Sequence, residues 1–104
     1  MLLFVLKYDI HPDKVDAFLK WAPGATQRIL AAPGIVEYRA YRSAAGASQV
    51  MATCEFADMA GWAAWYGNED IQKGFLELHS LALNVTTELW GPSPVVPAPL
   101  RPQK

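Results

Sequence analysis

Three large aromatic side chains lie within nine residues of this sequence, in the segment DMAGWAAWY (residues 58–66). Aromatic rings combine a large apolar surface with a polar edge, so such a cluster either fills a core or lines a pocket for a flat molecule. We predict that Trp62 packs against a sheet. Trp65 should lie at the edge of that packing, where its indole borders a ligand pocket and offers its N–H to a bound ring.

Few other side chains are suited to proton transfer or to binding an anion. Histidine titrates near neutral pH, which makes His79 a candidate general base. Arg39 and Tyr66 are candidates to stabilise an anion or to handle its proton. The predicted catalytic residues are Trp65, His79, Tyr66 and Arg39. The predicted substrate-binding residues are Trp62, Trp65, Phe75 and Tyr41.

Each of these residues also has a structural explanation that stays open. A lone histidine beside an apolar stripe usually has a structural role, which is the alternative for His79. Tyr41 falls beside Arg39 on one face of a strand, where it either meets a ligand or packs between subunits. His11 is expected only to begin a helix, and Cys54 to be an inert buried thiol.

Motifs of the commoner cofactor and hydrolase sites are missing from the sequence. Its two histidines and single cysteine do not have the spacing of a metal site. It contains no Gly-rich phosphate loop, no dinucleotide fingerprint and no nucleophile–base pair. We therefore expect no metal and no cofactor, and neither hydrolase, kinase nor nicotinamide chemistry.

The composition predicts a single domain that associates with itself. The chain has 104 residues, of which 52% are hydrophobic and 18% are charged. A monomer of this size has little interior for so much apolar surface, and homodimers bury such surface between subunits. We therefore expect a homodimer, with a small hydrophobic or aromatic molecule as its other partner.

The charge balance argues against nucleic acid and membrane partners. The net charge is −1, and no cluster of lysine and arginine stands out. The apolar start MLLFVLKYDI lacks a basic region and a cleavage site, and no stretch approaches the length of a membrane span. A single cysteine suits a reducing compartment, so we expect a cytoplasmic protein.

The hydrophobic pattern predicts an α+β fold with the element order βαββαβ. Strands are expected at residues 2–10, 35–42, 49–56 and within 83–90. A first helix should begin at Pro12 and stop at Pro33–Gly34, with a kink or a break at Pro23–Gly24. Further helices are expected at residues 58–66, with Asp58 as N-cap, and from residue 69 to about residue 82.

This order is the ferredoxin-like arrangement, in which both helical layers cover one face of an antiparallel sheet. We predict that residues 1–92 form the domain. The remaining segment, residues 93–104, is rich in proline and is expected to be an extended or disordered arm.

The alternation along the strands separates a helix-covered face from a mixed face. The helix-covered face should carry Leu2, Phe4, Leu6, Tyr8, Val36, Tyr38, Ala40, Val50, Ala52, Cys54, Phe56, Leu83, Val85, Thr87 and Leu89. The mixed face should carry Leu3, Val5, Lys7, Asp9, Ile35, Glu37, Arg39, Tyr41, Met51, Thr53, Glu55, Thr86, Glu88 and Trp90. A mixed face suits a sheet that packs on a second copy around a partly polar cavity. Alternatively, its charged residues pair with one another at a solvated interface.

Several short motifs carry a family resemblance, which covers residues 2 to about 92. They are Pro12 after the first strand, Ala32–Pro33–Gly34–Ile35, Tyr41–Arg42, Glu55–Phe56–Ala57–Asp58 leading into Trp62 and Trp65, and Leu89–Trp90–Gly91–Pro92. With these motifs the chain resembles the antibiotic biosynthesis monooxygenase (ABM) family of the dimeric α+β barrel superfamily.

The resemblance implies a homodimer whose two sheets close into a barrel, with a pocket between the sheet and the helices of each subunit. Members of the family include cofactorless monooxygenases that oxidise polyketide-type phenols, haem-degrading enzymes and small proteins of unknown role. The position of Trp65 resembles the pocket-lining tryptophan of the first two groups. Leu6 and Lys7 stand near the asparagine site of haem degraders, and Phe75 stands near their histidine site, which argues against haem.

The resulting prediction is a cofactor-independent monooxygenase that acts on a small aromatic or phenolic substrate, with molecular oxygen as co-substrate. A non-catalytic dimer that binds a small molecule or acts in stress is the alternative. Haem binding or degradation is the third possibility.

Overall fold

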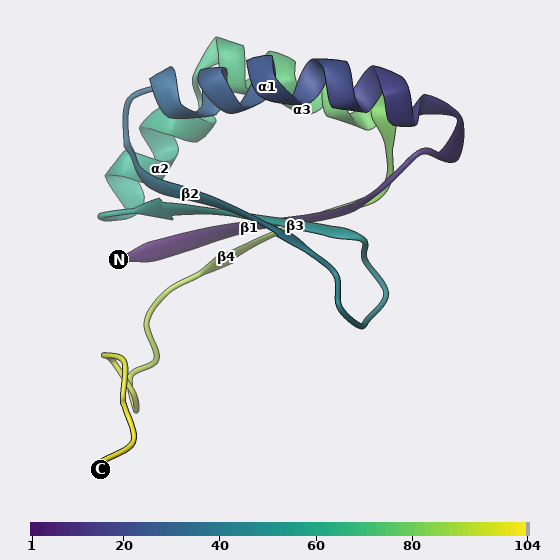
Figure 1. Ribbon diagram of the computed structural model, residues 1–104. Helices are drawn as coiled ribbons and strands as arrows, with labels where there is room; N and C mark the ends of the chain where they lie inside the picture. The colour runs from purple at the N-terminus through teal and green to yellow at the C-terminus, as the bar shows by residue number, and fades with distance from the viewer. Residues whose placement is uncertain (104) are drawn as a thin grey trace.

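The computed structural model describes residues 1–103, and Figure 1 shows its helices on one side of a sheet. The elements are β1 (Leu2–Ile10), the short 3-10 helix η1 (Pro12–Lys14), α1 (Val15–Ala31), β2 (Ile35–Arg42), β3 (Val50–Phe56), α2 (Met59–Tyr66), α3 (Glu69–Leu81) and β4 (Ala82–Trp90). The predicted order is therefore confirmed, with the second helical region divided at Gly67–Asn68.

The four strands form one antiparallel sheet in the order β2-β3-β1-β4. All three α-helices cover the same face of this sheet, which leaves the opposite face open (Figure 1). This arrangement confirms the predicted ferredoxin-like α+β fold. The closure of two such sheets into a barrel involves a second copy and stays a prediction.

The helices η1, α2 and α3 each begin directly after a polar residue whose side chain accepts a hydrogen bond from a backbone N–H of the first turn. The Asp58 carboxylate accepts a hydrogen bond from the Gly61 N–H at 2.9 Å, so its predicted role as N-cap of α2 is confirmed. Asn68 caps α3 in the same way. His11 accepts a hydrogen bond from the Asp13 N–H at 3.1 Å, which confirms that His11 begins a helical turn.

Helix α1 does not break at Pro23–Gly24, so of the two predicted outcomes, a kink or a break, the break is wrong. The helix continues over 17 residues with Pro23 inside it. Phe18 and Ala25, on either side of the proline, are both buried, whereas Pro23 and Gly24 are exposed. The packing of both halves of α1 against the rest of the protein stabilises the helix by more than it loses through the backbone hydrogen bond that Pro23 cannot donate.

Two irregularities in the sheet change the face of three residues. The register of β2 shifts between Ile35 and Glu37, so Ile35 pairs with Phe56 on the helix-covered face and Val36 is left exposed. The register of β4 shifts next to Asn84, which has a φ of 55°, so Leu83 pairs with Asp9 on the open face. The predicted faces of Ile35, Val36 and Leu83 are therefore wrong, because a bulge adds one residue to the two-residue period.

The turn between α1 and β2 brings two backbones into contact. Gly34 has a φ of 109°, a conformation that glycine adopts without strain. A Cβ atom at this position would overlap the carbonyl group of Gly61 in α2. Gly34 therefore allows α2 to approach the start of β2, and this contact places the following Trp62 and Trp65 over the sheet.

The open face of the sheet carries paired charges among large apolar side chains. Lys7 lies 3.3 Å from Glu88, and Arg39 lies 2.6 Å from Glu37. These four charged residues pair as the solvated-interface alternative expects. The large apolar side chains left exposed on this face are Leu3, Tyr41, Leu83 and Trp90.

The Pro-rich segment after β4 forms neither helix nor strand over residues 91–103 and extends away from the helical layer (Figure 1). The Ser93 hydroxyl accepts hydrogen bonds from the N–H groups of Val95 and Val96, both at 3.1 Å. The proposed boundary between the domain and residues 93–104 stays a prediction, and Lys104 lies outside the described residues.

Candidate functional site

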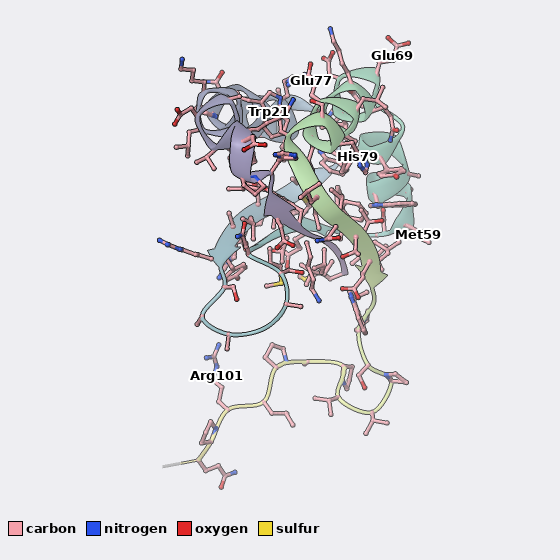
Figure 2. All side chains as sticks on the ribbon, turned by 90° about the vertical axis from the view of Figure 1, so that its right-hand side faces the viewer. Trp21, Met59, Glu69, Glu77, His79 and Arg101 are labelled. Atoms are coloured by element: carbon pink, nitrogen blue, oxygen red, sulfur yellow. The ribbon has the colours of Figure 1, made fainter. Side chains whose placement is uncertain are left out.

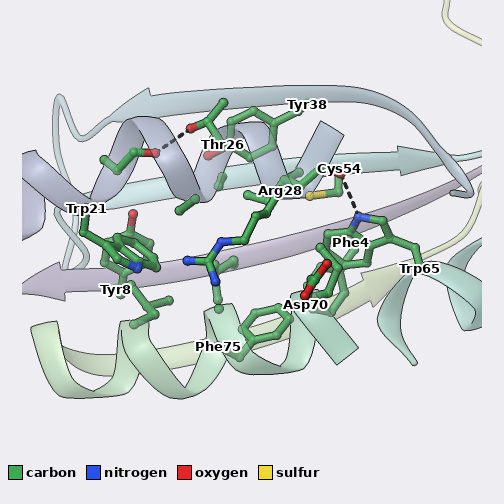
Figure 3. A pocket seen from close by; sticks show the side chains of 18 of the residues that line it. Phe4, Tyr8, Trp21, Thr26, Arg28, Tyr38, Cys54, Trp65, Asp70 and Phe75 are labelled. Carbon is green, nitrogen blue, oxygen red and sulfur yellow. Dashed lines mark hydrogen bonds between the residues drawn. The ribbon is translucent and has the colours of Figure 1, made fainter. Parts of the chain in front are cut away.

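A cavity of about 80 Å³ lies between the sheet and the helices (Figure 3). Its floor is the helix-covered face of β1, β2 and β3, and its roof is formed by α1 and α3. The lining residues are Phe4, Leu6, Tyr8, Phe18, Trp21, Ala22, Ala25, Thr26, Arg28, Ile29, Tyr38, Ala52, Cys54, Trp65, Asp70, Ile71, Gly74, Phe75 and Leu78. The cavity lies where the family resemblance implies a pocket.

Small residues on facing elements leave this space unfilled. On the floor, Ala52 and Cys54 occupy the helix-covered side of β3, which lies between β1 and β2. On the roof, Ala22 and Ala25 come from α1 and Gly74 comes from α3. Because close packing needs large side chains opposite small ones, small side chains on both layers produce a cavity.

Aromatic rings form one end of the cavity. Phe4 of β1 lies 5.8 Å from Trp65 and 6.1 Å from Phe75, measured between ring centroids. Trp65 and Phe75 meet edge to face at 6.3 Å and 89°. Rings in such edge-to-face contacts present a rigid apolar wall against which a flat ligand can pack.

Trp65 lines this cavity as predicted, but it lies in the core rather than at its edge. The side chain is only 1% exposed. Its indole N–H donates a hydrogen bond of 3.0 Å to the Ile29 carbonyl of α1, so it is not free for a ligand (Figure 3). The expectation that the Trp65 N–H is available to a ligand is therefore wrong, whereas a role of the Trp65 ring in substrate binding stays a prediction.

Charged and polar residues gather where α1 and α3 meet. The Arg28 guanidinium pairs with the Glu77 carboxylate, which also accepts a 2.9 Å hydrogen bond from the Trp21 N–H. These two donors, Arg28 first, lower the pKa of Glu77. Figure 2 shows Trp21 and Glu77 together at this junction, and Figure 3 shows Arg28 extending into the cavity. The Asp70 carboxylate also lines the cavity, so its rim carries both signs of charge.

The polar groups on the cavity floor are held neutral. Burial raises the pKa of Tyr8 to about 12, and Tyr38 raises it further. Burial also raises the pKa of Tyr38, with a smaller contribution from Cys54. Burial raises the pKa of the Cys54 thiol to about 12, which fits the predicted inert thiol. At neutral pH the floor therefore offers two phenolic hydroxyls and no anion.

Two of the predicted residues on α2 lie outside the cavity. The Trp62 ring stacks on Tyr66 at 5.0 Å and 18°, and it contacts Phe4 of the sheet, so its predicted packing role is confirmed. Its Nε1 atom is fully enclosed and has no hydrogen-bond partner within residues 1–103. Neither Trp62 nor Tyr66 lines the cavity, because they point to a different side of α2 from the inward-facing Trp65.

Three further predicted residues do not reach the cavity. His79 is exposed on α3 (Figure 2), whereas the preceding residue, Leu78, points into the cavity. Arg39 and Tyr41 lie on the open face of the sheet, where Glu37 raises the pKa of Arg39. The expectation that His79, Arg39 and Tyr41 meet a ligand beside Trp65 is therefore corrected for this cavity. Phe75 is the other predicted residue that lines it.

Three residues that line the cavity, Tyr8, Tyr38 and Arg28, have no predicted site role. Tyr8 and Tyr38 belong to the face that the alternation placed under the helices, and this part of the prediction is confirmed. The combination of two tyrosines with the small residues Ala52 and Cys54 on one face was the available signal. Arg28 gave no local signal, because its position over the cavity depends on how α1 packs.

The described residues hold no group of three histidine, cysteine or acidic side chains that is arranged to bind a metal ion. Within residues 1–103, none of the helices has the length and apolar character needed to cross a membrane.

The chain matches one protein family by its sequence and several solved structures by its fold. The sequence profile of the family described as "Antibiotic biosynthesis monooxygenase" matches residues 1–76. No curated protein matches the chain. Because 76 of the 104 residues match the family profile, the match covers more than half of the chain.

Several solved structures share the fold at low sequence identity. A crystal structure of an antibiotic biosynthesis monooxygenase is 16% identical, with 90% of this chain and 100% of that chain covered and a TM-score of 0.74. SnoaB from Streptomyces nogalater, described as a cofactor-independent oxygenase, is 14% identical over 93% and 97% of the two chains, with a TM-score of 0.71. A protein of the dabb family from Mesorhizobium loti, with a ferredoxin-like fold, is 12% identical over 88% and 96%, with a TM-score of 0.78.

At these identities the solved structures establish the fold alone, whereas the profile match extends from β1 into α3 and includes every residue that lines the cavity except Leu78. The cavity-lining Trp65 and Phe75 fall inside the matched segment. The chain belongs to the antibiotic biosynthesis monooxygenase family.

Proposed function

We propose that the protein is a cofactor-independent oxygenase that oxidises a small, electron-rich phenol in the cavity between its sheet and helices. The observation that carries the proposal is this cavity, which combines an aromatic wall with a few convergent polar groups. Such a lining is typical of small-molecule sites. Family membership and the fold shared with SnoaB support an oxygenase in particular.

The reaction needs only a reducing substrate and molecular oxygen. A phenol with an unsubstituted para carbon reacts with O2 to give a para-quinone and water. One oxygen atom bonds to the para carbon, and the second leaves as water with the hydroxyl proton and the para hydrogen. The substrate is oxidised by four electrons and O2 is reduced by four. The protein then has to bind the ring, stabilise its anion and exclude water.

The size of the cavity restricts the substrate. An engineered cavity of about 150 Å³ binds benzene, and the cavity here is smaller, at about 80 Å³. A bound ring must therefore displace side chains at the rim, where Arg28 and Glu77 are 30% and 35% exposed. We expect one or two fused rings to fit, with the ring against Trp65 and Phe75.

The proposal is tested by oxygen consumption with 1-naphthol, which the reaction above converts to 1,4-naphthoquinone. We expect protein-dependent uptake of one O2 per quinone formed. An oxygen electrode measures the uptake and mass spectrometry identifies the quinone. The rate should be the same with and without EDTA. Heat-denatured protein serves as the control. Uptake that is no faster than with denatured protein, for 1-naphthol and a panel of monocyclic phenols, would contradict an oxygenase.

A non-catalytic binding protein is the second candidate, and the position of His79 favours it. Within the described part of the chain no histidine lines the cavity, so a neutral-pH base is missing next to a bound phenol. This candidate predicts that phenols bind and stabilise the protein without any oxygen uptake.

We further propose that two copies associate through the open faces of their sheets. Leu83 and Tyr41 are each 44% exposed there and Trp90 is 57% exposed, which is apolar surface that a second copy would cover. Light scattering should give a particle of twice the 11.5 kDa chain mass. The double variant Tyr41→Glu and Trp90→Glu should shift this mass toward that of one chain, since it buries two charges in the contact. A wild-type mass of 11.5 kDa at micromolar concentration would contradict the association.

A further inference from the structure

Two tyrosines approach the cavity from opposite sides of its floor. Tyr8 comes from β1 and Tyr38 from β2, and β3 lies between these strands. On β3, Ala52 and Cys54 are too small to fill the space between the two phenol rings. Figure 3 shows Arg28 in the centre of the cavity, with Tyr8 to its left and Tyr38 above it in this view.

The hydroxyl groups of these tyrosines have spare hydrogen-bonding capacity. Tyr8 is 6% exposed, and its hydroxyl forms no hydrogen bond within residues 1–103. The polar neighbour of the Tyr38 hydroxyl is Thr26, whose own hydroxyl already donates to the Ala22 carbonyl at 3.0 Å. Neither hydroxyl oxygen is among the fully enclosed atoms without a partner, so both can reach the open space of the cavity, where a polar atom of a ligand could accept a hydrogen bond.

Both hydroxyls keep their protons at neutral pH, as an ordinary tyrosine does, and burial raises the pKa of each one further. A protonated tyrosine donates its O–H, and a hydrogen bond to an anion is stronger than one between neutral groups. The charged groups that line the cavity are Arg28 from α1 and Asp70 from α3, and both belong to the helical roof. The floor is therefore the neutral, donating side of the cavity.

We infer that Tyr8 and Tyr38 are catalytic residues whose hydroxyls donate hydrogen bonds to the ring oxygen of a phenolate bound in this cavity. The inference rests on the proposed function and adds to it the residues that hold the ionised substrate. Fixed donors that face the oxygen where negative charge resides lower the free energy of the anion. The ionised ring is the form that gives up electrons to O2 in the reaction above.

The test compares two ligands that differ only in an ionisable oxygen, 4-nitrophenol and nitrobenzene. Binding is measured by calorimetry under anaerobic conditions for the wild type, Tyr8→Phe and Tyr38→Phe. We expect each variant to bind 4-nitrophenol about tenfold more weakly than the wild type, and to bind nitrobenzene within about twofold of it. The phenolate absorption band of bound 4-nitrophenol should persist to lower pH in the wild type than in free solution, and less so in each variant.

Three results would overturn the inference. One is an equal loss of affinity for both ligands, because that indicates a packing role for the tyrosines. Another is a wild type that binds neither ligand or does not favour the phenolate. The third is a loss of affinity for 4-nitrophenol alone in Tyr41→Phe, on the open face of the sheet, with no such loss in Tyr8→Phe or Tyr38→Phe.

These outcomes are independent of the test of the proposed function, because no oxygen is present. If the wild type fails to oxidise 1-naphthol but the tyrosine variants lose phenolate binding selectively, the oxygenase proposal fails and the anion site stands. If 1-naphthol is oxidised at the same rate by all three proteins and phenolate binding is unchanged, the oxygenase stands and the role of the tyrosines is wrong.

Discussion

Replacing Ala52 with leucine should nearly abolish the binding of aromatic ligands. The Ala52 side chain lies on the cavity floor, so a leucine there projects into the space that a ring would occupy. Loss of about 100 Å² of apolar contact with a ring costs about 2.5 kcal/mol, which weakens binding on the order of 50- to 100-fold. Calorimetric titration with 4-nitrophenol measures this change directly.

The matched control for this variant is Ala64→Leu, on the exposed side of α2. It introduces the same side chain outside the cavity and should leave the affinity unchanged. The melting temperature of Ala52→Leu should stay close to that of the wild type, because the added atoms enter a void instead of a close-packed core. Unchanged ligand affinity in a folded Ala52→Leu protein would show that ligands bind elsewhere.

Replacing Gly34 with alanine should destabilise the fold by about 3 kcal/mol or more, since a left-handed backbone and a steric overlap both oppose the new side chain. The φ of Gly34 is 109°, and its Cβ would overlap the Gly61 carbonyl. Relief of the overlap requires α2 to move away from β2, and this movement would also displace Trp65 from the cavity wall. Urea unfolding at a fixed protein concentration gives the change in free energy.

The same substitution at Gly24 serves as the control. Gly24 lies inside α1, and nothing stands within 4 Å of a Cβ at that position. Alanine there should stabilise the protein by about 0.5 to 1 kcal/mol, because a helix interior favours alanine over glycine. If Gly34→Ala lowers the free energy of unfolding by less than Gly24→Ala raises it, the close contact between α2 and β2 is not important for the fold.

Much of the fold could be predicted from the sequence because the strands and helices have clear periods. The alternation along β1 and β3 correctly placed Phe4, Tyr8, Ala52 and Cys54 under the helices. The alternation failed at the start of β2 and near Asn84, where a bulge inserts an extra residue and no short-range signal marks it. In these two places the pairing with neighbouring strands decides which side chain faces the core.

The site was harder to predict than the fold, because the cavity is the space that three strands and three helices leave unfilled between them. Trp65 and Phe75 were found because large aromatic side chains are conspicuous. His79 was misplaced by one position: each helical residue turns about 100°, which directs Leu78 inward and His79 outward. Tyr8 and Tyr38 were assigned to the correct face, but the space between them depends on small residues of α1 and β3 that are far apart in the sequence.

The central claim is that ligands bind between the sheet and the helices, and the adjacent residues Met51 and Ala52 provide a direct test. Ala52 faces the cavity, whereas Met51 pairs with Lys7 and Tyr41 on the open face of the sheet. In an NMR titration with 4-nitrophenol, followed through methyl resonances, we predict that the Ala52 methyl shifts and shows NOEs to the ligand ring, while the Met51 methyl does neither. Ligand NOEs to Met51 with an unmoved Ala52 resonance would contradict the account and place the site on the open face.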